Sequence, residues 1–289
     1  MSSKHRIDAE RVDGLDPFHS IVPYVMPKRT EAEVSLTEKF DITELNKYIK
    51  ARNSSEQGTH LKLFHAICTS IARTIYHRPY MNRFIAGRHY WQRKEIALSF
   101  VAKQAFKDNA EETLMFLKIK PEMTINEISH IILGDVARAR SSGSNDLDKT
   151  MKLLGSLPRF ILEIIFFFVR RMEYHGIMPA ALMAGDPNYS TALLSNLGSI
   201  GAGAPYHHLS DYGTCSIMIT IGTMYAADTK MPDGTVQPRD YVDMTLTLDE
   251  RIADGFYFAK SLRLTKYMLE NPLVLEQPIG TPLPAEILS

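Results

Sequence analysis

The chain has 289 residues, of which 45% are hydrophobic and 23% are charged, and its 33 basic side chains balance 33 acidic ones. This composition is typical of a globular protein with a sizeable core, arranged as one large domain or two small ones. A net charge of zero excludes the basic footprint of a protein that binds nucleic acid or an anionic membrane surface. Residues 1–14 contain no apolar core, so they do not form a signal peptide.

The N-terminal part predicts a strand followed by helices. Residues 33–43 alternate apolar and polar side chains, which predicts a half-buried strand, and residues 44–53 continue as a short helix. Residues 59–79 place apolar side chains on one helical stripe. Thr59 is positioned to cap this helix, and Pro79 forbids its continuation.

The middle of the chain predicts a hairpin, a strand and a further helix. Gly87 separates two short strand-like runs, and residues 95–106 form a good strand pattern. Thr124 and Glu127 then stand at the spacing of a capping box, ahead of an amphipathic helix.

One apolar run, Phe160–Val169, is too short to span a membrane. It is shorter than the roughly 20 residues that span a bilayer, and Glu163 interrupts it. Arg170 and Arg171 close it. We therefore expect a helix buried in a large core or at a subunit interface, and no membrane partner.

The C-terminal part is richer in strands. Residues 189–200 and 214–225 predict two strands joined by a glycine-containing loop, and Met231–Gly234 predicts a hairpin turn. Residues 241–248 form another alternating strand, followed by a helix over residues 256–272. We predict an α+β domain in which helices cover a mixed β-sheet.

Three stretches carry a resemblance to a known family: residues 33–52 (EVSLTEKFDITELNKYIKAR), residues 191–205 (TALLSNLGSIGAGAP) and residues 245–255 (TLTLDERIADG). Together, and in this order, they resemble the catalytic domain of the 2-oxo acid dehydrogenase acyltransferases (the dihydrolipoyl acyltransferases). They also resemble chloramphenicol acetyltransferase, which shares its fold. The resemblance implies a two-layer fold over residues 33–289, preceded by an N-terminal extension in residues 1–32. No lipoyl-attachment or peripheral-subunit-binding segment is recognised, so we expect a free-standing catalytic-type domain.

The resemblance implies acyl transfer with coenzyme A or acyl-CoA as a substrate, in a homotrimer whose sites lie between subunits. In the family, a histidine removes the proton from the attacking thiol, and a serine of the neighbouring subunit donates to the oxyanion. The serine corresponds to Ser195. Residues 249–255 (DERIADG) resemble the family signature Asp-His-Arg-x-x-Asp-Gly, and they form the signature turn. Asp254 matches the second aspartate of this signature, which in the family braces the turn through an ion pair with an arginine; alone it is equally an N-cap.

Glu250 stands where the family has its histidine. An unperturbed glutamate has a pKa of about 4.3, and burial in an apolar channel raises such a carboxyl to about 6 or 7, enough for a general base. The alternative is that Glu250 pairs with Arg251 or another cation and only holds the turn. His207 or His208 is a candidate replacement base, whereas His65 and His130 are expected to be structural.

These residues support two hypotheses. The first is a CoA-dependent acyltransferase that moves an acyl group between a thioester and a thiol or other small acceptor, using Glu250, Ser195, Asp254 and His208. The alternative is a catalytically silent assembly or regulatory subunit of the same shape. We expect no metal site. Cys68 and Cys215 lie far apart without metal-ligand spacing, so we expect reduced, buried thiols and a cytoplasmic location.

Overall fold

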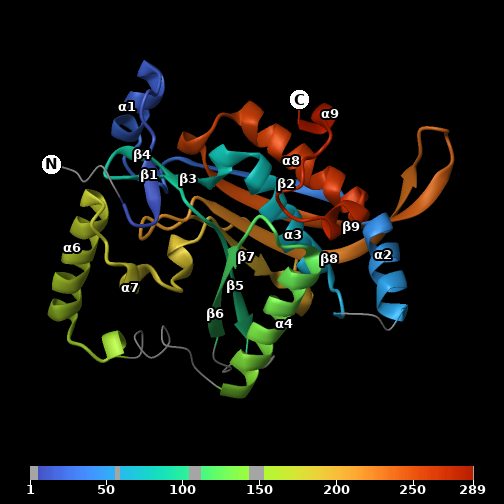
Figure 1. Cartoon of the computed structure of the whole chain (residues 1–289), viewed down its shortest axis with the longest axis horizontal. Helices are drawn as coiled ribbons and strands as arrows, with labels where there is room; N and C mark the ends of the chain where they lie inside the picture. Colours follow the sequence, from blue (N-terminus) through green and yellow to red (C-terminus); the bar gives the residue numbers. More distant parts are fainter. Residues whose placement is uncertain (1–5, 56–58, 104–111, 143–152, 289) are drawn as a thin grey trace.

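The structure is a computed structural model that describes residues 6–55, 59–103, 112–142 and 153–288 (Figure 1). Its centre is a six-stranded mixed sheet with the strand order β2-β9-β8-β7-β5-β6. Strand β7 runs parallel to both of its neighbours, and the other pairs are antiparallel. The strands are β2 (Glu33–Asp41), β5 (Ile96–Lys103), β6 (Glu112–Ile119), β7 (Ala192–Asn196), β8 (Ile217–Lys230) and β9 (Val236–Asp249).

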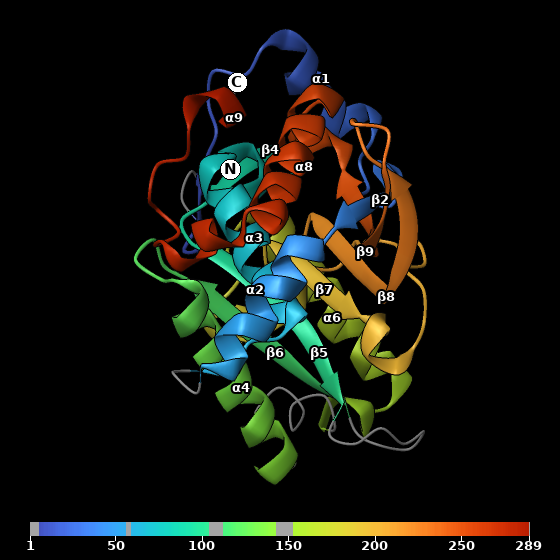
Figure 2. The same ribbon diagram turned by 90° about the vertical axis from the view of Figure 1, so that its right-hand side faces the viewer.

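Helices cover one face of this sheet, which confirms the predicted α+β class (Figures 1 and 2). They are α2 (Thr43–Ser54), α3 (Leu63–His77), α4 (Ile125–Ser142) and α8 (Gly255–Glu270). Alternate strand residues such as Phe40, Leu98, Leu194, Ile219 and Met244 point to the helices and form the main core.

On the opposite face of the sheet, β2 and β9 present hydroxyl groups. The hydroxyls of Ser35 and Thr247 are 2.9 Å apart across β2 and β9, and those of Thr37 and Thr245 are 2.8 Å apart. The loop after β7 crosses this face, because Thr245 Oγ1 donates to the Ala204 carbonyl at 2.7 Å. Apolar and polar residues alternate along these strands, so that the apolar side chains face the helices and the hydroxyls face the other side.

A small second sheet joins the N-terminal segment to the body. Its order is β1-β4-β3, from β1 (Ala9–Arg11), β3 (Arg83–Ala86) and β4 (His89–Arg93). The hairpin between β3 and β4 needs Gly87, which has a φ of 57° and whose Cβ would lie 2.0 Å from the Tyr174 carbonyl oxygen. The segment predicted as an N-terminal extension thus contains a paired strand and helix α1 (Pro17–Val25).

The remaining helices are α6 (Arg159–His175), α7 (Ala180–Met183) and α9 (Ala285–Leu288). Helix α6 lies at the edge of the molecule (Figure 1) and buries none of its residues, so it does not lie in a large core. The alternative expectation, a subunit interface, stays a prediction. Phe160 and Phe167 are each 64% exposed. Only one flank of the helix packs, where Val169 and Met172 meet a small satellite cluster. No helix in the described part of the chain is long and apolar enough to cross a membrane.

One predicted helix start is also wrong. Helix α3 begins at Leu63 with Lys62 as its N-cap residue, and Thr59 does not cap it. The reason is that the side chain of Asn53 binds both backbone groups of Leu61 at 2.9 Å, which holds this stretch outside the helix. Strand β6 was not predicted from the sequence.

Candidate active site

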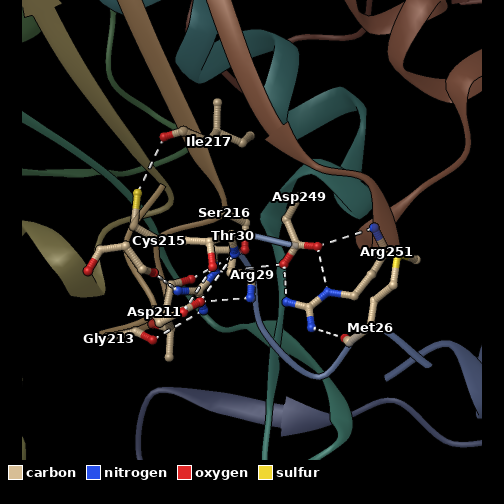
Figure 3. Close-up of polar contacts among 12 residues, drawn as sticks. Met26, Arg29, Thr30, Asp211, Gly213, Cys215, Ser216, Ile217, Asp249 and Arg251 are labelled. Atoms are coloured by element: carbon tan, nitrogen blue, oxygen red, sulfur yellow. Dashed lines mark hydrogen bonds and ion pairs between the residues drawn. The ribbon is translucent and has the colours of Figure 1, made fainter. Parts of the chain in front are cut away.

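The signature turn is fixed by a buried ion pair that the sequence reasoning missed. Strand β9 ends at Asp249, and a short 3-10 turn follows. Arg251 Nε and Nη2 donate to the two carboxylate oxygens of Asp249, each at 2.7 Å, and both side chains are buried (Figure 3). The remaining Arg251 Nη1 donates to the Met26 carbonyl at 2.8 Å. This bidentate geometry is the strong form of a charge-assisted hydrogen bond.

A second buried guanidinium, that of Arg29, extends this cluster. Its Nε lies 3.7 Å from Asp249 Oδ2, and its Nη1 donates to the Ser210 carbonyl. Burial lowers the pKa of Arg29, and the negative charge of Asp249 opposes that shift. Asp211 accepts hydrogen bonds from the backbone N–H of Arg29 at 2.8 Å and from the Thr30 hydroxyl at 3.0 Å (Figure 3). The N-terminal segment, the loop after β7 and the signature turn are therefore tied together.

Glu250 points away from this cluster. Its side chain is exposed, and its backbone N–H donates to the Ala32 carbonyl at 2.9 Å. Among the described residues its carboxylate makes no hydrogen bond or ion pair. The alternative that Glu250 pairs with Arg251 is wrong, because Asp249 occupies that guanidinium. The carboxylate is available to a second molecule, and the described part of its own chain leaves it exposed.

Asp254 caps helix α8. Its Oδ1 accepts a hydrogen bond from the backbone N–H of Tyr257 at 2.7 Å, which is the usual geometry of an N-cap. The implied ion pair between this aspartate and an arginine is absent among the described residues; the bracing arginine, Arg251, binds Asp249 instead.

Ser195 lies near the end of β7, where it is half-buried. Its hydroxyl has no hydrogen-bond partner among the described residues. Ser195 is one of the residues that line a cavity of about 470 Å³, which is bounded by β5, β7, α3, α4 and the loop after β7. The Ser-Asn-Leu-Gly sequence is explained by a close approach of two chain segments. A Cβ at Gly198 would lie 2.3 Å from the Gly222 carbonyl oxygen, so only glycine fits the turn after Ser195.

His207 lines the same cavity as Ser195, whereas the predicted His208 does not. His207 Nδ1 lies 2.8 Å from the His208 carbonyl, and His208 Nδ1 lies 2.9 Å from the Leu209 carbonyl. Because a carbonyl only accepts, Nδ1 carries the proton in both rings, and Nε2 of a neutral ring keeps its lone pair. This is the two-nitrogen arrangement of an imidazole base. No group of metal-ligating side chains is found within the described ranges.

Ser195 and Glu250 do not meet within one chain. Ser195 pairs with Thr220 on β8, whereas Leu248, the next-to-last residue of β9, pairs with Ile217. With strands about 4.8 Å apart and a rise of about 3.3 Å per residue, this register separates the two by more than about 10 Å. A site that uses both residues needs two copies of the chain.

Comparison with known proteins shows what the chain is similar to. Residues 180–276 match the family model of the 2-oxoacid dehydrogenases acyltransferase (catalytic domain). The cubic core of a pyruvate dehydrogenase multienzyme complex is similar in structure, with a TM-score of 0.61 and 14% identity over 92% of this chain and 94% of that one. The dihydrolipoamide acetyltransferase of Azotobacter vinelandii gives a TM-score of 0.60 and 14% identity over the same shares. A chloramphenicol acetyltransferase gives 0.50 and 12% identity over 91% of this chain and 98% of that one. A search of curated protein sequences found no match.

The fold is therefore the acyltransferase fold that these structures share, as predicted. Within it, residues 180–276 match the model of the 2-oxoacid dehydrogenase acyltransferase catalytic domain, which confirms the predicted resemblance. This matched segment contains Ser195, the glycine turn, the two histidines and the signature turn around Glu250.

Proposed function

We propose that the protein is a CoA-dependent acyltransferase, with an acyl-CoA thioester as donor and a thiol or other small nucleophile as acceptor. The observation that carries this proposal concerns Ser195, whose hydroxyl has no hydrogen-bond partner among the described residues. Ser195 lines a cavity, and it belongs to the segment that matches the acyltransferase family model. A hydroxyl held in this way is able to donate to a developing oxyanion, a contribution of roughly 3 kcal/mol.

In the proposed reaction, the Glu250 carboxylate removes the proton from the acceptor thiol. The sulfur then attacks the thioester carbonyl carbon, and Ser195 donates a hydrogen bond to the oxygen that becomes negative. Collapse of this intermediate breaks the bond to the sulfur of coenzyme A, which recovers the proton from Glu250. The products are the new thioester and free coenzyme A. His207, which lines the same cavity as Ser195 and whose Nδ1 is held by a carbonyl, is the alternative base.

We propose a homotrimer in which Ser195 of one copy faces the Glu250 turn of the next. The separation of these residues within one chain supports this arrangement. So does the unpacked apolar surface of the molecule, because Phe18 of α1 is 72% exposed and Phe167 of α6 is 64% exposed. A neighbouring copy would also supply the enclosure that Glu250 lacks. Cys68 and Cys215 are both free and buried, which supports a reducing, cytoplasmic location.

The competing function is a catalytically silent subunit of the same shape, and the exposed Glu250 in the place of a histidine favours it. A transfer screen separates the two. Acetyl-CoA and longer acyl-CoA esters are offered with dihydrolipoamide and other small thiols or amines, and release of coenzyme A is followed against enzyme-free controls. Turnover that depends on an acceptor supports the acyltransferase. Saturable binding of coenzyme A without any turnover supports the silent subunit.

A further inference from the structure

An apolar cavity of about 220 Å³ lies between the sheet and helices α3 and α8. Its inner wall comes from buried residues of α3 and β8, among them Ile71, Ile75 and Ile219. Its mouth is lined by exposed residues of β2 and α8, because Val34 is 41% exposed and Gly255 is also exposed. The cavity is distinct from the one that contains Ser195.

The polar side chains around this cavity already have partners. Thr74 and Thr265 share a hydrogen bond of 2.8 Å. Ser261 Oγ donates to the backbone carbonyl of its own helix at 2.8 Å, and Glu38 is paired with a lysine at 2.6 Å. The hydroxyl protons of these side chains are already used in hydrogen bonds, and most of the wall is apolar. A polar ligand group would therefore lose its hydrogen bonds to water with little compensation. The apolar wall therefore favours a hydrocarbon group as the ligand.

The mouth of the cavity lies beside the signature turn. Val34 of β2 faces Leu248 of β9, and both line the cavity. The next residue pair along the two strands is Glu33 and Asp249, and Glu250 follows directly. A hydrocarbon inside the cavity therefore ends within about one residue pair of the Glu250 turn.

We infer that this cavity binds the aliphatic chain of the acyl group, with the thioester placed at the Glu250 turn. This inference rests on the proposed function and names its substrate class. A cavity of about 150 Å³ lined by aliphatic and aromatic side chains holds the six carbons of benzene. In proportion, 220 Å³ accommodates about eight to nine carbons. The substrate is thus a medium-chain acyl thioester rather than an acetyl ester.

The first test measures the chain-length dependence of binding. Calorimetry compares coenzyme A with its acetyl, butanoyl, hexanoyl, octanoyl, decanoyl and dodecanoyl esters on the full chain. Each buried methylene strengthens binding about fourfold, so octanoyl-CoA should bind about 10²-fold more tightly than butanoyl-CoA. The gain should stop near nine carbons, where the cavity is full. Equal affinity for the acetyl and octanoyl esters would overturn the inference and leave the proposed function intact.

The second test narrows the mouth at Gly255. A Cβ at this residue meets no atom within 4 Å, so Gly255→Leu is accommodated without backbone strain. We expect the variant to bind acetyl-CoA as the wild type does and to lose the preference for octanoyl-CoA. Gly134→Leu is the matched control, because Gly134 is exposed on α4 and its Cβ also meets nothing within 4 Å. A thermal melt of each variant confirms folding, and an unchanged octanoyl preference in folded Gly255→Leu would overturn the inference.

Binding of free octanoate tests whether the cavity holds a hydrocarbon chain independently of the proposed acyl-CoA function. One possible result is that octanoate binds to the wild type but not to Gly255→Leu, and that coenzyme A binds to neither. The cavity is then a fatty-acid site, and the proposed acyl-CoA function is wrong. If neither octanoate nor any acyl-CoA ester binds, both proposals are wrong.

Discussion

Asp249 and Arg251 flank Glu250 and bind each other through two buried hydrogen bonds of 2.7 Å. Because both neighbours are held inside, Glu250 is directed outward. Asp249 and Arg251 thus stabilise the turn, whereas Glu250 is the residue of the turn that is left for chemistry. The pair also fixes the N-terminal segment, since Arg251 donates to the Met26 carbonyl.

The first prediction concerns this pair. Asp249→Asn removes the charge that compensates two buried guanidinium groups, those of Arg251 and Arg29. Breaking a buried pair by removing one partner costs about 3–5 kcal/mol in the free energy of unfolding. Thermal denaturation should show a drop of several degrees in Tm, whereas Glu250→Gln, at an exposed residue, should change stability by less than about 0.5 kcal/mol. Equal melting temperatures for the wild type and Asp249→Asn would show that the pair does not hold the turn.

The second prediction is the oligomeric state. Light scattering at micromolar concentration should give about three times the chain mass of 32.7 kDa. A monomer that retained acyltransferase activity would contradict the two-copy site, because Ser195 and Glu250 lie apart within one chain.

The elements that the sequence predicted well are those with strong local signals. The alternation in Glu33–Asp41 produced strand β2, and residues 231–234 produced the hairpin turn between β8 and β9. The start of α3 was mispredicted because a distant side chain, Asn53, binds the backbone of Leu61, which no local propensity reveals. In the candidate site, too, contacts between residues far apart in the sequence were not predictable.

Ser195 was found through its motif, and so was the position of Glu250. The buried pairing of Asp249 with Arg251 and Arg29 joins residues up to 220 positions apart, which a single sequence does not connect. One signal was available, since the aspartate and arginine that flank Glu250 both match the family signature. Which of the two candidate histidines lines the cavity has a similar cause, because adjacent residues in an extended loop differ only in direction.

The third prediction is an acid-dependent loss of stability from His65. Burial is the main cause that lowers the pKa of this histidine from 6.5 to about 4, and the charges of Lys62 and His60 add to it. Between these two values the unfolded chain binds a proton at His65 and the folded chain does not. Stability therefore falls as the pH decreases from about 6.5 to about 4, by up to about 3 kcal/mol, and is unaffected by this group above that range. His65→Gln should flatten the dependence of Tm on pH in this window, while His130→Gln on the exposed face of α4 should leave it unchanged.

The fourth prediction tests Ser195 as the oxyanion donor. Ser195→Ala should lower kcat by about 10²- to 10³-fold and leave KM for the acyl-CoA ester nearly unchanged, because the hydrogen bond strengthens only as charge develops on the oxygen. Ser54→Ala, at the exposed end of α2, is the matched control. A loss confined to KM would assign Ser195 to ground-state binding instead.

The fifth prediction decides which residue is the base. If Glu250 removes the proton, Glu250→Gln keeps the shape of the side chain and lowers the rate by about 10²- to 10⁴-fold, while the exposed position leaves Tm unchanged. If His207 is the base, Glu250→Gln retains activity within a few-fold and His207→Gln loses it, because the ring anchored at Nδ1 no longer offers Nε2 as an acceptor. Glu250→His complements both variants, since it restores the histidine of the family signature. Should Glu250→His create acetyl transfer to dihydrolipoamide where the wild type has no turnover with any acceptor, the natural protein is the silent subunit. In that case Glu250 alone accounts for the lost chemistry, because the serine, the glycine turn and the buried Asp249–Arg251 pair are all in place.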